Sequence, residues 1–268
     1  MQSRKNGHRH IWLLSGIGEG HCLAKVLADE GWEVTVSVVN DSASLPYQEM
    51  RLRAIHIGPL QGVEGIKRVL QDAASLHNGF QWVIDATHPF ALEISTNLQN
   101  ACKDFDQPLL CFERPIEEVG DANLIKDFKE LSKYCFHERN FLMAIGARHL
   151  RQAVFYAHQS GAKVFARVLP SPTSLRQALM CSLSDSQLAV IRPFVGSVKG
   201  EFERALCQRW SISDVLCRQS GGLTEQLWGS LCKEEKINLW LIRRPTLDRK
   251  VEVVHTFDCL LERISCFP

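Results

Sequence analysis

The sequence predicts an α/β protein with two Rossmann-like domains, each built on a mainly parallel sheet, and a ligand cleft between the domains. Short apolar strands alternate with helix-like segments, and this alternation pauses after residue 112 and starts again at residue 141. A polar segment, Glu113–Asn123, separates the two series and marks the expected boundary. Strands that alternate with helices of this length indicate βαβ units, in which consecutive strands run parallel. We expect the domains to cover residues 1–117 and 118–268.

The first series begins with a short apolar strand at His10–Leu14. Apolar residues at helical spacing then predict a helix over Glu19–Glu30, which Gly31 would end. A β-branched strand follows at Val34–Val39. The remaining elements, in chain order, are strand Ile55–Ile57, helix Gly62–Leu76, strand Trp82–Ile84, helix Pro89–Phe105 and strand Pro108–Phe112.

The second series repeats the pattern with short, apolar, buried-looking strands and with helices between some of them. The expected strands are Phe141–Ile145, Val164–Val168, Leu188–Ile191, Val215–Cys217 and Leu239–Ile242. The expected helices lie near Ser174–Cys181, Lys199–Arg209 and Thr224–Lys236.

Composition excludes several classes of protein. The formal net charge of +1 offers no broad basic field for nucleic acid or an anionic membrane, and no apolar run approaches the roughly 20 residues of a membrane span. Ten cysteines are scattered without a C-x-x-C pair, so we expect reduced thiols and no protein-bound metal. We expect a cytoplasmic protein without nucleic acid or membrane partners.

A Gly-rich stretch, SGIGEG, lies between the first strand and the first helix. Glycines let the backbone approach a ligand closely, and a helix N-terminus offers N–H groups to a phosphate. The spacing is G-x-G-x-G, which is neither the dinucleotide fingerprint nor a P-loop. The alternative is a Gly-rich turn without a ligand. The residues of this candidate phosphate loop are Ser15, Gly16, Ile17, Gly18, Glu19 and Gly20.

The end of the second strand is where dinucleotide-binding domains read the adenosine ribose. Asp41 follows this strand and could accept hydrogen bonds from the ribose of NADH, whereas Arg51 or Arg53 could reach a 2′-phosphate of NADPH. The alternative is that Asp41 only opens a solvated loop.

The stretch DATHPFALEIS follows the apolar run FQWVI. Pro89 suits the first position of a helix, and the residue before a proline is extended, so Asp85, Thr87 and His88 should cluster at the carboxyl edge of the sheet. Ligands bind at that edge in open α/β folds. His88 could hold an anion or supply a proton near neutral pH. The alternative is that Thr87 and His88 only satisfy the helix N-terminus.

DATHPFA, Asp85–Ala91, resembles the most recognisable motif of the precorrin-6A reductases, enzymes of cobalamin biosynthesis. Five further segments resemble that family in the same order: LLSGIGEG, VTVSVV with Ser37, PLLCFERP, GARHL and RQSGG, and LIRRP follows at the last strand. The resemblance implies that a hydride passes from NADPH, with NADH as the alternative, to a ring double bond of precorrin-6A or its cobalt form, giving precorrin-6B. It implies a nicotinamide-binding first domain, with Ser37, Asp85 and Thr87 joining the Gly-rich loop, and a substrate-binding second domain. His88 is the candidate proton donor.

Several residues depart from the family pattern. Ile17 stands where the family usually has threonine, and Ser15 replaces a first glycine. Asn40 and Asp41 occupy the region where an arginine is common, so the preference for NADPH stays open. Arg218 replaces a frequent lysine, which exchanges a point charge for a planar fork.

A precorrin carries many acetate and propionate arms, and arginine suits the recognition of carboxylates. The second domain has arginines at or just beyond the ends of its expected strands, and parallel strands bring such ends to one edge of a sheet. A surface cation is the alternative for each. The candidate substrate-binding residues are Arg148, Arg167, Arg192, Arg218, Ser220, Gly221, Gly222 and Arg243, with Arg244 adjacent. Two other functions stay open: a non-catalytic NAD(P)H sensor, and a methyltransferase of the same pathway that binds S-adenosylmethionine.

Overall fold

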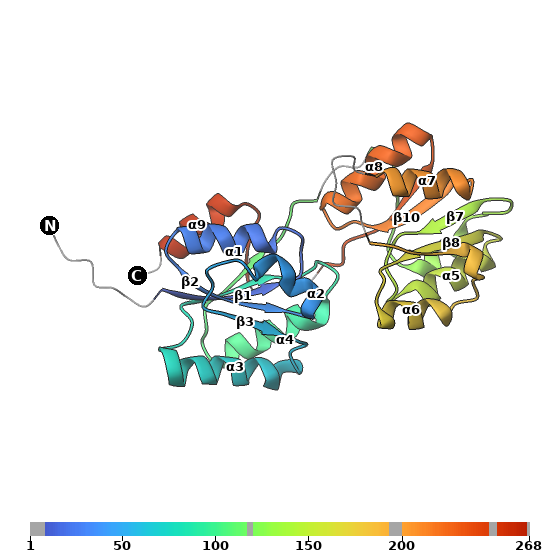
Figure 1. The fold of residues 1–268 in the computed structure, drawn as a ribbon. Helices are drawn as coiled ribbons and strands as arrows, with labels where there is room; N and C mark the ends of the chain where they lie inside the picture. The colour runs from blue at the N-terminus through green and yellow to red at the C-terminus, as the bar shows by residue number, and fades with distance from the viewer. Residues whose placement is uncertain (1–8, 117–119, 193–199, 247–250, 267–268) are drawn as a thin grey trace. The chain divides into compact units, whose positions relative to one another are not determined.

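The structure is a computed structural model that describes residues 9–116, 120–192, 200–246 and 251–266, and it divides the chain into two compact units (Figure 1). Unit 1 comprises residues 1–115 and 245–268, and unit 2 comprises residues 116–244. Each unit is an α/β body with its own six-stranded sheet, as the sequence predicts.

The sheet of unit 1 has the order β12-β5-β4-β1-β2-β3, and every neighbouring pair is parallel. This is the strand order of dinucleotide-binding folds, because the chain moves outward from β1 in one direction and then returns to build the other side from β4. The strands are β1 (His10–Ser15), β2 (Glu33–Val38), β3 (Ala54–Ile57), β4 (Trp82–Ala86), β5 (Leu109–Phe112) and β12 (Glu252–Val254).

Helices cover both faces of this sheet (Figure 1). On one face, Leu27 of α1 and Leu260 of α9 join a core with Leu13. On the other face, Ile66 of α3 and Leu98 of α4 pack around Trp12 and neighbouring strand residues. The helical elements are α1 (Gly20–Asp29), α2 (Asp41–Ser44), the 3-10 turn η1 (Leu45–Tyr47), α3 (Gly62–His77), α4 (Leu92–Asp104) and α9 (Phe257–Ser265).

The sheet of unit 2 has the order β6-β11-β10-β7-β8-β9, again with only parallel pairs. Counted from β7, its first five strands repeat the arrangement of unit 1. The position that β12 fills in unit 1 is filled here by β6, the first strand of the unit. The strands are β6 (Asn123–Ile125), β7 (Asn140–Met143), β8 (Lys163–Val168), β9 (Leu188–Val190), β10 (Asp214–Arg218) and β11 (Asn238–Ile242).

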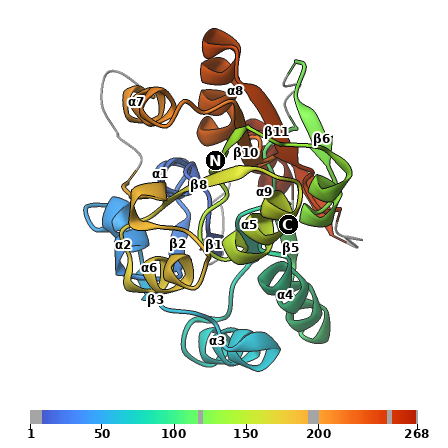
Figure 2. The ribbon, with the colours of Figure 1, turned by 90° about the vertical axis from the view of Figure 1, so that its right-hand side faces the viewer.

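The helices of unit 2 also lie on two sides of its sheet (Figure 2). Cys207 of α7 and Trp228 of α8 pack on Leu142 and Val215. The side of α5 and η2 holds an aromatic cluster of Phe136, Phe141 and Trp240. The helical elements are η2 (Phe128–Lys133), α5 (Leu150–Gln159), α6 (Pro172–Leu179), η3 (Asp185–Gln187), α7 (Glu201–Arg209) and α8 (Leu223–Glu235).

The expected domain boundary at residue 117 lies close to the division at residues 115 and 116, but the expected second domain ends too late. The structure returns residues 245–268 to unit 1. The reason is pairing across a long sequence separation: β12 aligns Val253 with Cys111 of β5, and α9 buries Leu260 and Ile264 against the same sheet.

Helix α4 begins at Leu92, so the expectation that Pro89 opens this helix is wrong. A tight turn forms first, because the N–H of Ala91 donates to the carbonyl oxygen of His88 at 2.7 Å and the N–H of Phe90 donates to Nδ1 of His88 at 3.2 Å. Two helices, α5 and α9, and the three-residue edge strands β6 and β12 were not predicted. Lys199, the expected start of α7, lies outside the described residues.

All ten cysteines are free thiols. Burial raises the pKa of the Cys102, Cys207 and Cys232 thiols to about 12, so these side chains stay protonated. Among the described residues, no helix combines the length and the apolar character needed to cross a bilayer.

Candidate functional site

The Gly-rich loop and the DATHPF segment of unit 1 meet between β1 and β4, where the strand order of the sheet reverses. β1 leads into α1 on one face of the sheet, and the neighbouring β4 leads into α4 on the other. In open α/β folds, ligands bind at this point of the carboxyl edge. The N–H of Gly16 donates to the carbonyl oxygen of Ala86 at 2.9 Å. A Cβ at Gly16 would lie 3.0 Å from the backbone nitrogen of His88 and 3.1 Å from Cα of Thr87. Glycine at this position therefore permits the contact between the Gly-rich loop and the DATHPF segment.

The Gly-rich loop presents backbone donors at this edge of the sheet. In the described part of the chain, the N–H groups of Ile17, Gly18 and Glu19 donate to no backbone carbonyl, while the N–H of Gly20 bonds Ile17 at 3.1 Å. A Cβ at Gly18 would meet nothing within 4 Å, so the backbone there is open to a ligand. Open N–H groups at the start of α1 fit the diphosphate of a dinucleotide.

The side chains of the loop are held from two directions. The Ser15 hydroxyl shares a 2.5 Å hydrogen bond with the Tyr47 hydroxyl, and burial raises the pKa of the Tyr47 phenol. Glu19 accepts an ion pair from Nε of Arg114 at 2.9 Å. Glu19 thus serves in part to fix the start of α1 to the chain that follows β5.

The residues considered for ribose recognition separate in the structure. Asp41 is exposed at the start of α2, where Asn40 caps the helix by accepting from the N–H of Ala43 at 3.0 Å. Arg53 lies at the opposite, amino edge of the sheet: its N–H donates to Val34 at 2.9 Å and its guanidinium pairs with Glu33. Arg53 is therefore held away from the carboxyl edge, where the cofactor is expected to bind.

Ser37 is buried on the α3 side of β2, and its Oγ accepts from Nε1 of Trp12 at 2.8 Å. The Ser37 hydroxyl thus already has a hydrogen-bond partner within the core of unit 1. The predicted contact of Ser37 with a cofactor stays a prediction.

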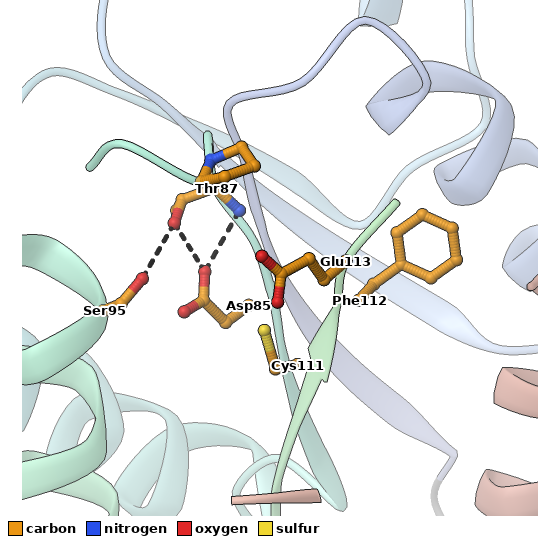
Figure 3. Close-up of a pocket in the computed structure, with 7 residues that line it drawn as sticks. Asp85, Thr87, Ser95, Cys111, Phe112 and Glu113 are labelled. Carbon is orange, nitrogen blue, oxygen red and sulfur yellow. Dashed lines mark hydrogen bonds between the residues drawn. The ribbon is translucent and has the colours of Figure 1, made fainter. Parts of the chain in front are cut away.

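Asp85 organises the turn after β4 (Figure 3). One carboxylate oxygen accepts from the N–H of Thr87 at 3.0 Å and from its hydroxyl at 2.7 Å, and the Thr87 hydroxyl also contacts Oγ of Ser95 at 3.1 Å. Asp85 is 3% exposed. The hollow beside it, which Cys111 and Glu113 also line, has no room for a water-sized group. Asp85 and Thr87 therefore fix the backbone conformation of the turn after β4.

His88 lies half-buried next to this turn. Because Nδ1 accepts the N–H of Phe90, a neutral His88 ring carries its proton on Nε2. Its tautomer is thus set so that Nε2 can donate.

Unit 2 has the equivalent change of direction between β7 and β10. The GARHL segment follows β7, and the RQSGG segment follows β10, so the topology brings Arg148 and Arg218 to one edge. Burial and the nearby Arg148 lower the pKa of Arg218, and burial followed by Arg218 and Arg148 lowers the pKa of His149. Arg148, His149 and Arg218 thus lie near enough to influence one another, and guanidinium groups suit the recognition of carboxylates.

Hydrogen bonds with Glu225 and Arg244 hold the RQSGG loop. Ser220, Gly221 and Gly222 are buried, and the N–H of Gly221 donates to Oε2 of Glu225 at 2.6 Å. Gly221 has φ +68°, a left-handed conformation that favours glycine. The carbonyl and side chain of Gln219 in turn accept from Nε and the backbone N–H of Arg244, at 3.3 and 3.1 Å.

The other arginines differ in their surroundings. Arg167 is half-buried and faces Glu203 at 3.4 Å, so a carboxylate of the chain already compensates its charge. Arg192 and Arg243 are exposed at strand ends, and the N–H of Arg243 donates to Ile125 at 2.8 Å. In the described residues, no three metal-ligating side chains gather.

Sequence reasoning missed Tyr47, His149 and the role of Glu225. Tyr47 has no motif around it, and only the path of the chain after β2 brings it back to Ser15. The role of Glu225 could have been predicted, because an acid four residues after Gly221 and in the first turn of a helix can accept from the N–H groups of the preceding loop.

Comparisons with known proteins identify relatives of this chain. The family model for "Precorrin-6x reductase CbiJ/CobK" matches residues 10–265. A cobalt-precorrin-6A reductase of Synechocystis sp. is 29% identical over 241 residues, which is 88% of either chain. A precorrin-6A reductase of Rhodobacter capsulatus is 29% identical over 242 residues, again with 88% of either chain covered. A solved structure of CobK precorrin-6A reductase has a TM-score of 0.73 at 23% identity over 96% of either chain, a likeness that shows the fold.

Proposed function

Because this chain belongs to the precorrin-6x reductase family, which comprises NAD(P)H-dependent oxidoreductases that act on a carbon–carbon double bond, we propose that it reduces precorrin-6A or its cobalt form to precorrin-6B. The reaction serves cobalamin biosynthesis. We further propose that it takes place in the cytoplasm without a nucleic acid partner. Any cobalt would arrive as part of the substrate.

The open N–H groups of the Gly-rich loop are the observation that supports this proposal most directly. Ile17, Gly18 and Glu19 would hold the diphosphate of the cofactor, and Gly16 keeps the loop against the turn that Asp85 and Thr87 build. When bound, the reduced nicotinamide supplies a hydride. The chain contributes by binding the cofactor in a fixed orientation.

Carboxylate arms of the substrate would bind to unit 2. We propose that Arg148 and Arg218 make the main contacts, with Arg192 and Arg243 as exposed cations at the same sheet edge. Ser220 would add its hydroxyl and Gly222 its backbone N–H, while Gly221, whose N–H is bonded to Glu225, would set the shape of the loop. Arg167 keeps Glu203 as its partner, so we assign it a supporting role.

His88 is the proposed proton donor. The proton would come from the imidazolium form of His88 and pass to the ring carbon next to the one that receives the hydride, which returns the imidazole to its neutral form. The neutral ring, whose Nδ1 accepts the N–H of Phe90, is the state of His88 after this transfer.

We propose NADPH as the hydride donor, as the resemblance implies. A specific observation favours NADH as the second candidate: exposed Asp41 follows β2, where an acid usually reads ribose hydroxyls, and Arg53 is held at the other edge of the sheet.

One experiment tests the proposal. The purified protein is mixed with precorrin-6A, with and without cobalt, and the absorbance of NADPH and then of NADH is followed. We expect oxidation of at least one cofactor with at least one substrate, and no oxidation in any combination refutes the reductase assignment. Arg218→Gln should raise KM for the tetrapyrrole about tenfold through loss of a charged contact, whereas the control Arg209→Gln, at an exposed helix end, should not.

A further inference from the structure

A hydroxyl pair lies beneath the Gly-rich loop. Ser15 is the last residue of β1, and its Oγ is 2.5 Å from the hydroxyl oxygen of Tyr47, which belongs to η1 after β2. Tyr47 is 3% exposed, so its ring is part of the core around α1. This bond joins the start of the Gly-rich loop to η1, which follows β2.

The same pair occupies the space beside Gly20. A Cβ at Gly20 would lie 1.8 Å from Oγ of Ser15 and 2.6 Å from the hydroxyl of Tyr47. The first residue of α1 thus has no side chain because the two hydroxyl groups fill that place. Close packing at this point joins the end of β1, the start of α1 and η1 after β2.

The backbone between Ser15 and Gly20 contains the N–H groups that are open to a ligand. Both ends of this short loop touch the hydroxyl pair, so the pair limits the conformations available to the backbone between them. A loop that is already ordered loses less entropy when it binds an anion.

We infer that Tyr47 is a positioning residue for the nicotinamide dinucleotide, acting through Ser15 and Gly20 to hold the loop backbone in the conformation that receives the diphosphate. This inference rests on the proposed function. Tyr47 itself does not touch the cofactor, because its ring is buried and its hydroxyl is engaged with Ser15.

The test uses Tyr47→Phe in the full chain, which keeps the buried ring and removes only the hydroxyl. Titration of NADPH, followed by nicotinamide fluorescence, should show a Kd about two- to tenfold higher than in the parent protein, the range expected for one lost hydrogen bond. KM for NADPH should rise by the same factor, while kcat and KM for the tetrapyrrole should not change. The control Tyr156→Phe, on α5 of unit 2, should bind NADPH like the parent.

A second variant keeps the inference falsifiable if Tyr47→Phe does not fold. Ser15→Ala removes the other partner of the same bond, so its Kd should rise at least as much, and the double variant should show less than the product of the single effects. A parent-like Kd for NADPH in both single variants overturns the inference, even if their stability falls. Failure of the parent protein to bind either NADPH or NADH refutes the proposed function instead.

Discussion

Gly16 donates its N–H to the carbonyl oxygen of Ala86 at 2.9 Å, and this bond joins the first strand's loop to the turn after β4. Gly16→Ala would push a methyl group against the backbone of Thr87 and His88, at 3.0 to 3.1 Å. We expect the free energy of unfolding to fall by about 1–3 kcal/mol, as in other overpacked sites, in urea titrations.

Gly18→Ala is the matched variant for that experiment. A Cβ at Gly18 meets nothing within 4 Å, so stability should change by no more than about 0.5 kcal/mol. Binding of NADPH should weaken, because the methyl group would stand where the diphosphate approaches. Equal loss of stability in both variants would contradict the different packing of the two glycines.

Asp85 holds the turn that follows β4 through two hydrogen bonds from Thr87. Asp85→Ala leaves the half-buried N–H and hydroxyl of Thr87 without their acceptor, so we expect a loss of about 1–3 kcal/mol in the free energy of unfolding. Asp85→Asn should lose less, because an amide oxygen can still accept. Asp72→Ala, at an exposed position of α3, serves as the control and should unfold like the parent.

Substitution of His88 should affect proton transfer and not cofactor binding. His88→Ala should lower kcat about 100-fold, the lower range for a lost general acid, and leave the Kd for NADPH unchanged. Stopped-flow turnover and fluorescence titration measure the two quantities. His56→Ala, at an exposed position of β3, is the control. Turnover at the parent rate would remove His88 from the mechanism.

Glu225 braces the loop that we assign to substrate carboxylates. Glu225→Ala removes the acceptor 2.6 Å from the N–H of Gly221, and Gly221 must keep its left-handed conformation without it. We expect KM for the tetrapyrrole to rise about tenfold while the Kd for NADPH is unchanged, since the loss of a charged hydrogen bond is of this size. Equal rises in both constants would indicate general damage to the fold.

His149, the N-cap residue of α5, and His158 within α5 contribute to the pH dependence of stability. Both side chains are exposed in part, and their partial desolvation lowers the pKa of each below the ordinary value of 6.5, with Arg218 and Arg148 lowering that of His149 further. The unfolded chain therefore binds more protons than the folded chain below pH 6.5, so this stability is full above 6.5 and is lost as the pH falls through the folded pKa values. Urea unfolding at about pH 7.5 and about pH 5.5 should show a smaller loss for His149→Gln than for the parent. An equal loss would contradict the assignment.

Much of the site could be predicted from the sequence because its motifs follow buried strands. The apolar runs before SGIGEG, DATHPFA and RQSGG identify parallel strands, and parallel strands place the residues after them at one edge. The side chains that hold these loops were harder to find. Tyr47 and Arg114 reach the first loop from segments that carry no pattern linking them to it.

Local pattern by itself determined the α/β class, the alternation of strands and helices, and the edge at which the motifs lie, because periodicity and turn residues act over a few neighbouring positions. Tertiary structure alone decided that residues 245–268 return to unit 1 and that Arg53 lies at the amino edge of its sheet. It also decided that Ser15 bonds Tyr47 and that Ser37 bonds Trp12. Each of these depends on pairing between residues far apart in the sequence, which short-range preferences do not specify.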